Sequence, residues 1–294
     1  MRSRRRAIAV TLAAAFVAAG CSGSGDTASD ARSLTRGPER IDYGDHPDTY
    51  GELWLPIDDD GPDPEGVPVV VLIHGGFWRD GFALDLMDPL VPSLLDEGFA
   101  VWNIEYRRVG AGGGYPQTFV DAAAAIDVLA DLPERFDGVL DLGDVATVGH
   151  SAGGHLAVWL ASRRLLPVGV PGVDPEVIPE TAVSQAGVLD LIGCVDEGIG
   201  GTACTDLVGA LPGDDPVRYA QTSPAELQPI EAEVIAVHGA DDRIVPVSQS
   251  ETYVERATAA GSTARLVVVD GADHFSNLDP THPAWRAVID ALTR

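Results

Sequence analysis

The sequence predicts an α/β fold in which a mostly parallel β-sheet is flanked by helices. Short apolar runs recur along the chain, at residues 67–73, 99–104, 145–148, 182–186, 234–237 and 266–269. The apolar residues in these runs mostly follow one another rather than alternate with polar ones, which is typical of parallel strands that are covered on both faces. Helical patterns lie between these runs, and the length of 294 residues suits one large domain.

The first strands are expected to be antiparallel. Residues 41–43 and 51–55 have the pattern of a strand pair, and an Asp-, Gly- and Pro-rich segment at 58–66 separates them from the run at 67–73. Further along, residues 119–132 place apolar side chains at the spacing of one helix face. We therefore expect antiparallel strands at one edge of the sheet and helices packed on its faces.

A serine stands between the run at 145–148 and a helical stretch at 156–163, in the pentapeptide Gly149-His150-Ser151-Ala152-Gly153. A serine hydroxyl is a weak nucleophile, so an enzyme that uses one holds it uncrowded and beside a base. Flanking glycines let a strand turn sharply into a helix, whose first N–H groups then point at the space above the serine. Ser151 is therefore the candidate nucleophile.

Two polar loops follow later apolar runs and supply candidates for an acid and a base. The run at 234–237 leads into a loop with Asp241 and Asp242, and the run at 266–269 leads into a loop with His274. Serine hydrolases of the α/β type place nucleophile, acid and base in this order along the chain. We expect His274 to be the base and Asp242 to be the acid, with Asp241 as the alternative and Asp190 as a more distant one.

Three motifs in this order resemble the α/β-hydrolase superfamily: the serine pentapeptide, His-Gly-x-x-Asp-x-x-Val-Pro at 238–246, and Asp-His-Phe at 273–275. The resemblance extends from about residue 39 to the C-terminus. With His-Gly-Gly-Phe-Trp at 74–78, the run at 102–108 and the glycines at 112–114, the chain is similar to the esterase, lipase and arylformamidase-like branch. It is more distantly similar to prolyl-oligopeptidase catalytic domains. The resemblance implies an α/β-hydrolase fold that uses neither a metal nor an organic cofactor.

The loop after the run at 67–73 resembles the oxyanion loop of these enzymes. There, backbone N–H groups of this loop and of the residue after the nucleophile stabilise the developing oxyanion. The resemblance assigns this role to Gly76, Phe77 and Ala152. The side chains expected to line the substrate pocket are aromatic: Trp78, Tyr115 and Phe275.

A long insertion interrupts the alternation of strands and helices between the runs at 182–186 and 234–237. It has no long periodic helix, and such insertions tend to form lids, so we expect a cap at about residues 188–232, between the sixth and seventh strands. Cys194 and Cys204 lie in it, and the short loop between them can close into a disulfide in an oxidising compartment. A metal site is the weaker alternative, because no other cysteine or histidine lies near them at ligand spacing.

Residues 1–20 have the pattern of an export signal, with several arginines before an apolar stretch that is short for a membrane span. The sequence Ala18-Ala19-Gly20-Cys21 resembles a bacterial lipobox, in which the cysteine is lipidated. Ordinary cleavage that leaves Cys21 free is the alternative. We expect a cell-envelope lipoprotein held on the membrane through Cys21, with a flexible tether at 21–38 and a catalytic domain at 39–294.

The chain is strongly acidic, with a formal net charge of −26 at pH 7. Such a surface repels phosphate backbones, so nucleic-acid binding is excluded as an expected function. The same charge gives no attraction to anionic lipid headgroups, which leaves the acyl chains on Cys21 as the expected membrane contact.

The leading functional hypothesis is hydrolysis of carboxylic esters of small or aromatic substrates, through an acyl-enzyme on Ser151. Amide hydrolysis, either arylformamidase-like or on short peptides, is the alternative, because the same triad serves both bond types. A non-catalytic exported binding protein is a third reading. It is disfavoured because no member of the catalytic constellation is missing from the sequence.

Overall fold

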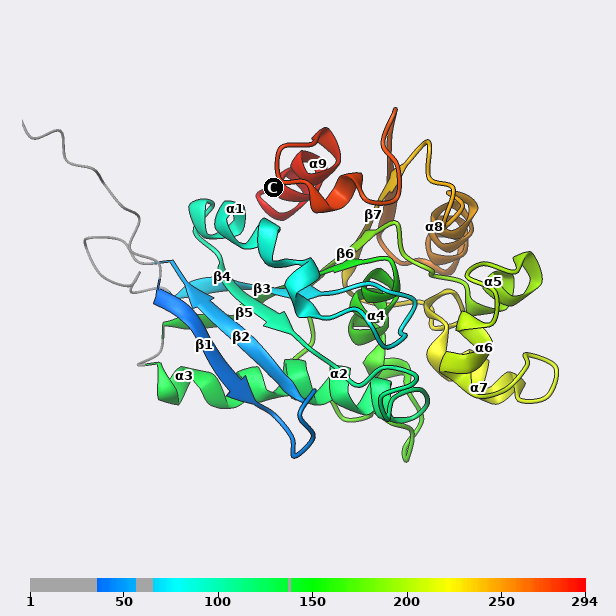
Figure 1. Cartoon of the computed structure of the whole chain (residues 1–294), viewed down its shortest axis with the longest axis horizontal. Helices are drawn as coiled ribbons and strands as arrows, with labels where there is room; N and C mark the ends of the chain where they lie inside the picture. The colour runs from blue at the N-terminus through cyan, green and yellow to red at the C-terminus, as the bar shows by residue number, and fades with distance from the viewer. Residues whose placement is uncertain (1–35, 57–65, 137–138) are drawn as a thin grey trace, which may run out of the picture. The chain divides into compact units, whose positions relative to one another are not determined.

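The computed structural model describes residues 36–56, 66–136 and 139–294, and these contain a sheet of eight strands (Figure 1). The strands lie in the order β1-β2-β4-β3-β5-β6-β7-β8. Their bounds are β1 Arg36–Asp42, β2 Tyr50–Leu55, β3 Val67–Ile73, β4 Ala100–Ile104, β5 Leu140–His150, β6 Thr181–Gln185, β7 Glu233–Gly239 and β8 Ala264–Val269. The expected signal peptide, Cys21 and most of the expected tether lie outside the described residues.

The strand directions confirm a mostly parallel sheet with antiparallel strands at one edge. β2 runs antiparallel to β1 and to β4, whereas the strands from β4 across to β8 pair in parallel. β1 begins at Arg36, before the domain start that was expected at Glu39, because the backbone there already pairs with Leu55 of β2. Residues 36–38 therefore belong to the sheet.

Helices cover both faces of the sheet, with α1 and α9 above it and α2 and α3 below it in Figure 1. One apolar core joins α2 and α4 to the sheet, and a second joins α1 and α9 to the opposite face. The helix bounds are α1 Val91–Asp96, α2 Gln117–Asp127, α3 Leu132–Arg135, α4 Ala152–Ala161, α5 Leu191–Glu197, α6 Ala203–Val208, α7 Pro216–Thr222, α8 Ser248–Ala260 and α9 Pro283–Leu292.

The helix expected at 119–132 is divided into three pieces. α2 ends at Asp127, a 3₁₀ helix follows at Val128–Asp131, and α3 begins at Leu132. Pro133 lies in the first turn of α3, where it has no N–H to donate to the preceding turn. The spacing of the apolar residues gives no sign of this break in the helix.

The insertion between β6 and β7 holds three short helices, α5, α6 and α7, which lie together on the right of Figure 1. A disulfide joins Cys194 in α5 to Cys204 in α6, and both residues are buried. Asp190 begins the segment by capping α5, since its Oδ1 accepts the N–H groups of Ile192 and Gly193. The distant alternative for the catalytic acid is thus a helix cap.

The carboxyl ends of the parallel strands meet at one edge of the sheet. The loops that follow β3, β5, β7 and β8 begin at this edge. They carry the candidate oxyanion residues, Ser151, Asp242 and His274, respectively. Open α/β sheets bind their ligands at this edge, because its loops can vary while the strands hold them in place.

The disulfide is expected to stabilise the fold measurably. Replacing both cysteines with alanine should lower the free energy of unfolding by about 2–3 kcal/mol, because the unfolded chain regains the entropy of the opened loop. Urea unfolding of the wild type and of Cys194→Ala/Cys204→Ala measures the difference. Wild type treated with a reductant is the matched control and should unfold like the double variant. An unchanged midpoint in both would contradict this role.

Candidate active site

Ser151 occupies a strained turn between β5 and α4. Its backbone has φ 56° and ψ −115°, a conformation that L-residues rarely adopt and that is typical of nucleophile elbows. The turn is so tight that a Cβ on Gly149 would lie 2.0 Å from the carbonyl oxygen of Gly153. The Ser151 N–H donates to the carbonyl of Gln185 at the end of β6 (2.8 Å). Strand β6 therefore also bonds to the turn at Ser151.

Asp242 and His274 form a hydrogen-bonded pair. His274 Nδ1 donates to Asp242 Oδ2 over 2.7 Å, and both side chains are almost completely buried. The other carboxylate oxygen, Oδ1, accepts the N–H groups of Ile244 and Val245. With Nδ1 protonated, Nε2 of the neutral ring is free to accept a proton, as a general base requires.

The charge state of Asp242 is fixed by its partners. Burial by itself would raise the pKa of Asp242, but hydrogen bonds from His238 and His274 outweigh it and hold the pKa well below the ordinary value. The structure thus brings Asp242 to the base as an ionised carboxylate. Asp241, the alternative acid, lines the surface hollow beside His274 instead.

His150 links the base to the elbow. Its Nε2 donates to the carbonyl of His274 (2.8 Å), and the centres of the two rings are 4.8 Å apart. Because Ser151 directly follows His150, these contacts hold the base loop beside the candidate nucleophile. Burial lowers the pKa of His150 to about 3, so this ring stays neutral.

The loop after β3 places backbone N–H groups near the serine. Gly76, Phe77 and Trp78 all have positive φ, at 111°, 53° and 53°. A Cβ on Gly75 would lie 3.1 Å from that of Ser151, which measures how closely the loop approaches the elbow. In the described part of the chain, no main-chain carbonyl accepts the N–H of Gly76 or Phe77. This loop and the first turn of α4 can therefore form an oxyanion hole.

Trp78 fastens this loop to α4. Its Nε1 donates to the carbonyl of Ala152 (3.1 Å), and its ring lies edge-on to that of His155 at 5.0 Å. The side chain is completely buried. Trp78 was expected to line the substrate pocket, but it presents no surface to a substrate and instead packs inside the protein.

A buried ionic network adjoins the loop; its member His74 is expected from the sequence to be a structural histidine that anchors the loop, whereas Glu105 and Arg108 have no role predicted from the sequence. Glu105 accepts hydrogen bonds from His74 Nε2 (2.9 Å), from Arg108 and from the N–H of Leu84 (3.0 Å). The ring of His74 stacks on Tyr106, whose hydroxyl donates to the His74 carbonyl. Burial by itself would raise the pKa of Glu105, but its hydrogen bonds and the nearby positive charge lower it. The signal for this network in the sequence is a charged residue, Glu105, directly after the buried strand β4.

Residues of the cap contact the oxyanion loop. The ring of Phe77 packs against Gly200 in the loop that the disulfide closes. Arg79 donates to Thr202 (3.0 Å) and to Asp206 (3.1 Å), both on the cap. Phe77 and Arg79 thus tie the strained backbone to the α5–α6 region.

The other two aromatic candidates for the pocket differ in exposure. The N–H of Tyr115 donates to the carbonyl of Leu207, and its half-buried ring lies under the guanidinium of Arg218. Phe275 is 53% exposed and meets the ring of His274 edge-on. Of these two side chains, only Phe275 stands in the open beside the base.

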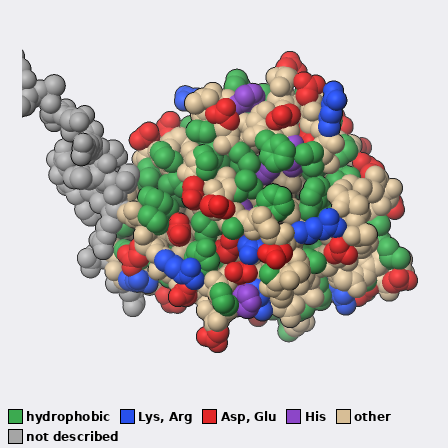
Figure 2. Space-filling model, in the orientation of Figure 1, with side chains coloured by type: hydrophobic (Ala, Val, Ile, Leu, Met, Phe, Trp, Pro, Cys, Tyr) green, Lys and Arg blue, Asp and Glu red, His purple; other side chains and the backbone are tan. Residues whose placement is uncertain are grey.

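Two surface hollows adjoin the site. One, of about 500 Å³, is lined by His274 and Phe275 together with Ile244. The other, of about 680 Å³, is lined in part by Phe82, which is 48% exposed and packs against Gly76 of the oxyanion loop. Figure 2 shows acidic side chains spread over this view of the molecule and hydrophobic ones gathered in its upper half. The hollow beside His274 gives solvent, and hence a small substrate, access to the base.

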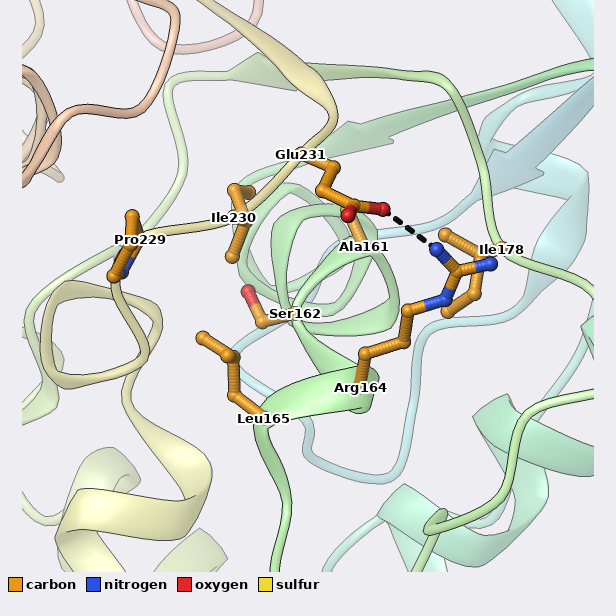
Figure 3. A pocket seen from close by; sticks show the side chains of 8 residues that line it. All are labelled: Ala161, Ser162, Arg164, Leu165, Ile178, Pro229, Ile230 and Glu231. Atoms are coloured by element: carbon orange, nitrogen blue, oxygen red, sulfur yellow. Dashed lines mark hydrogen bonds and ion pairs between the residues drawn. The ribbon is translucent and has the colours of Figure 1, made fainter.

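A further hollow of about 290 Å³ lies at the opposite end of α4 (Figure 3). Leu165 and Ile230 face into it, beside the ion pair of Arg164 and Glu231 (2.6 Å). α4 has 10 residues and begins directly after Ser151. At about 1.5 Å of rise per residue, the hollow is roughly 15 Å from the serine. This hollow takes no part in the catalytic arrangement.

In the part of the chain that the structure describes, no cluster of three or more His, Cys, Asp or Glu side chains could hold a metal ion. Within residues 36–56, 66–136 and 139–294, no helix is both long and apolar enough to cross a membrane.

Comparisons with known proteins point to esterases. A model of the BD-FAE family matches residues 55–256 of the chain. Isoprenylcysteine alpha-carbonyl methylesterase ICME of Arabidopsis thaliana is 26% identical over 249 residues, which are 80% of this chain and 55% of that protein. Esterase LipC of Mycobacterium tuberculosis is 27% identical over 252 residues, which are 82% of this chain and 60% of LipC. The chain thus spans little more than half the length of these relatives.

Solved structures share the fold. A truncated carbohydrate esterase from gut microbiota superposes with a TM-score of 0.76 at 20% identity, covering 90% of this chain and 97% of that one. Esterase B from Lactobacillus rhamnosis superposes with a TM-score of 0.70 at 19% identity, covering 87% and 82%. These similarities confirm the predicted α/β-hydrolase fold.

The buried histidines predict a loss of stability in mild acid. Burial lowers the pKa of His155 to about 4, as it lowers that of His150 to about 3. The unfolded chain protonates both below about pH 6.5, so stability is full above that pH and declines as the pH falls toward 4. Each histidine should contribute a slope of about 1.4 kcal/mol per pH unit. Urea unfolding at pH 7, 6 and 5 measures the slope.

Replacing His155 alone tests how much one of these histidines contributes to the pH dependence of stability. His155 Nε2 donates to the carbonyl of Thr222, and His155→Gln keeps an N–H at that place but cannot be protonated. The slope of His155→Gln should be smaller by about 1.4 kcal/mol per pH unit. An unchanged slope would show that His155 does not carry this dependence.

Proposed function

The chain belongs to the BD-FAE family, and from this premise we propose that it is a serine carboxylesterase that acts through an acyl-enzyme on Ser151. The observation that carries the proposal is the 2.7 Å hydrogen bond between His274 Nδ1 and Asp242 Oδ2, in a loop that bonds to His150, the neighbour of the strained Ser151. The names of the relatives, among them a methylesterase and esterase LipC, support ester hydrolysis.

In the proposed first step, Ser151 Oγ attacks the carbonyl carbon of the ester while Nε2 of His274 takes the hydroxyl proton. Asp242 keeps the other ring nitrogen protonated and stabilises the imidazolium that forms. Its low pKa supports this role, since the carboxylate stays ionised through the reaction. The tetrahedral intermediate then breaks its bond to the alkoxy oxygen, which leaves as the alcohol with the proton from His274.

The negative charge of the intermediate lies on the former carbonyl oxygen. The N–H of Ala152 begins α4, and those of Gly76 and Phe77 belong to the strained loop. These donors are fixed before the substrate binds, so they need not reorganise as the charge develops. In the second step a water molecule repeats the attack on the acyl-enzyme, with His274 again taking and returning one proton, and releases the carboxylic acid.

The proposed substrates are carboxylic esters of small or aromatic compounds. The exposed ring of Phe275 beside the base supports an apolar contact with the substrate. Esters are favoured over amides by the family and by the relatives, since the triad chemistry itself serves both.

We also propose that the chain is exported and anchored through a lipid on Cys21. The arginine-rich, apolar leader and the lipobox-like residues before Cys21 support this, as does the disulfide of Cys194 and Cys204, which suits an oxidising compartment. Mass spectrometry of the membrane-extracted protein should find a diacylglyceryl group on Cys21. A chain that retains residues 1–20 would contradict export.

Replacing the nucleophile tests the proposed activity. Ser151→Ala should lower the hydrolysis of p-nitrophenyl acetate and butyrate by at least about a thousandfold and leave the thermal midpoint nearly unchanged. Asp242→Asn and Asp241→Asn are the matched pair for the acid, and Asp242→Asn should lose far more activity. Turnover that survives in Ser151→Ala would overturn the acyl-enzyme mechanism.

The same assay, run with N-formylaniline and aminoacyl anilides beside the esters, measures bond preference. We expect kcat/KM to be higher for the esters. A higher value for an amide, with Ser151→Ala still inactive, would transfer the mechanism to amide hydrolysis and contradict the ester proposal alone.

A further inference from the structure

A second buried histidine lies next to the catalytic acid. His238 is the penultimate residue of β7, and Asp242 belongs to the loop that follows this strand. The side chains of both are fully buried, and His238 Nε2 is 3.4 Å from Asp242 Oδ2. This is the same carboxylate oxygen that accepts the hydrogen bond from His274.

The hydrogen bonds of His238 determine its tautomer. Nε2 is 2.9 Å from the carbonyl oxygen of Val245, which can only accept, so Nε2 carries the hydrogen. Nδ1 is 2.8 Å from Oγ of Ser250 in α8, so the unprotonated Nδ1 of the neutral ring accepts the hydroxyl proton. The Nε2–H therefore donates to Val245, and Asp242 Oδ2 lies beside it at 3.4 Å.

Two hydrogen bonds to Val245 connect the loop that carries Asp242 to His238. The N–H of Val245 donates to Asp242 Oδ1 (2.9 Å), and its carbonyl accepts from His238. His238 itself is anchored in β7 and, through Ser250, in α8. The carboxylate thus contacts three groups: the ring of His274, the N–H groups of its own loop, and the ring of His238.

We propose that His238 is a positioning residue for the proposed ester hydrolysis, which orients the carboxylate of Asp242 toward His274. The inference rests on the proposed function. His238 is fully buried, so it touches no substrate and acts only through Asp242. Its hydrogen bond also contributes to the low pKa of that carboxylate, together with the bond from His274 and the N–H of Val245. A misaligned carboxylate would still bind substrate but would stabilise the imidazolium less well.

The experiment compares the full chain with variants at His238, using p-nitrophenyl acetate. His238→Leu should lower kcat by about tenfold or more and leave KM within about twofold, because only the transition state needs the aligned acid. His238→Gln, whose amide N–H can replace Nε2–H, should recover most of kcat. Ser250→Ala removes the bond that anchors Nδ1 of His238 to α8, so the ring can tilt away from Asp242, and it should lower kcat about threefold or more with KM unchanged.

A double-mutant cycle separates positioning from general destabilisation. In the background of Asp242→Asn, His238→Leu and Ser250→Ala should each change kcat by less than about twofold, because the carboxylate they orient is gone. Equal losses in both backgrounds would overturn the proposal, as would a wild-type kcat in His238→Leu. If His238→Leu does not fold, the cycle with Ser250→Ala carries the test in the same way.

Ser151→Ala is assayed in parallel. Loss of activity in Ser151→Ala with a wild-type kcat in His238→Leu refutes the positioning role alone. Activity that persists in Ser151→Ala refutes the acyl-enzyme mechanism, and the positioning role falls with it.

Discussion

The left-handed backbone of Ser151 is the constraint on which the rest of the site depends. A strand that turns into a helix within one residue leaves no room for a side chain at Gly149, and the carbonyl of Ile73 at the end of β3 leaves none at Gly153. Ser151, between them, adopts the strained conformation. This turn points the first N–H of α4 toward the site, and it puts His150 against the loop of His274. Elbow, base and oxyanion donors are therefore parts of one local geometry.

A second strained segment, the oxyanion loop, is held from three directions. Glu105 and His74 anchor its start, Trp78 bonds to Ala152 beside the elbow, and Phe77 packs under the cap. Positive φ at consecutive non-glycine residues costs energy, so it persists only where the surroundings fix it. In the proposed mechanism, the cap and the buried ion network thus fix the loop that carries the oxyanion donors.

Local patterns were enough to locate the sheet, the sharp turn at Ser151 and the polar loop that carries His274, because apolar runs and the polar loops after them are visible in sequence. These patterns could not choose between Asp241 and Asp242, because neighbouring residues in one turn differ only in the direction of their side chains. In the structure, Asp242 bonds to His274. The pairing of Glu105 with His74 and the burial of Trp78 arise from contacts between distant segments. No periodicity or motif encodes such contacts, so only the folded chain reveals them.

In the proposed mechanism Asp242 and His274 activate Ser151, so covalent capture of that serine is the most direct measurement. A fluorophosphonate reacts with a serine hydroxyl in the way an ester does, and tandem mass spectrometry locates the adduct. The account predicts a single adduct on Ser151, formed at least about a hundredfold more slowly in His274→Ala. An adduct on a different residue, or labelling of Ser151 at an unchanged rate in His274→Ala, would contradict it.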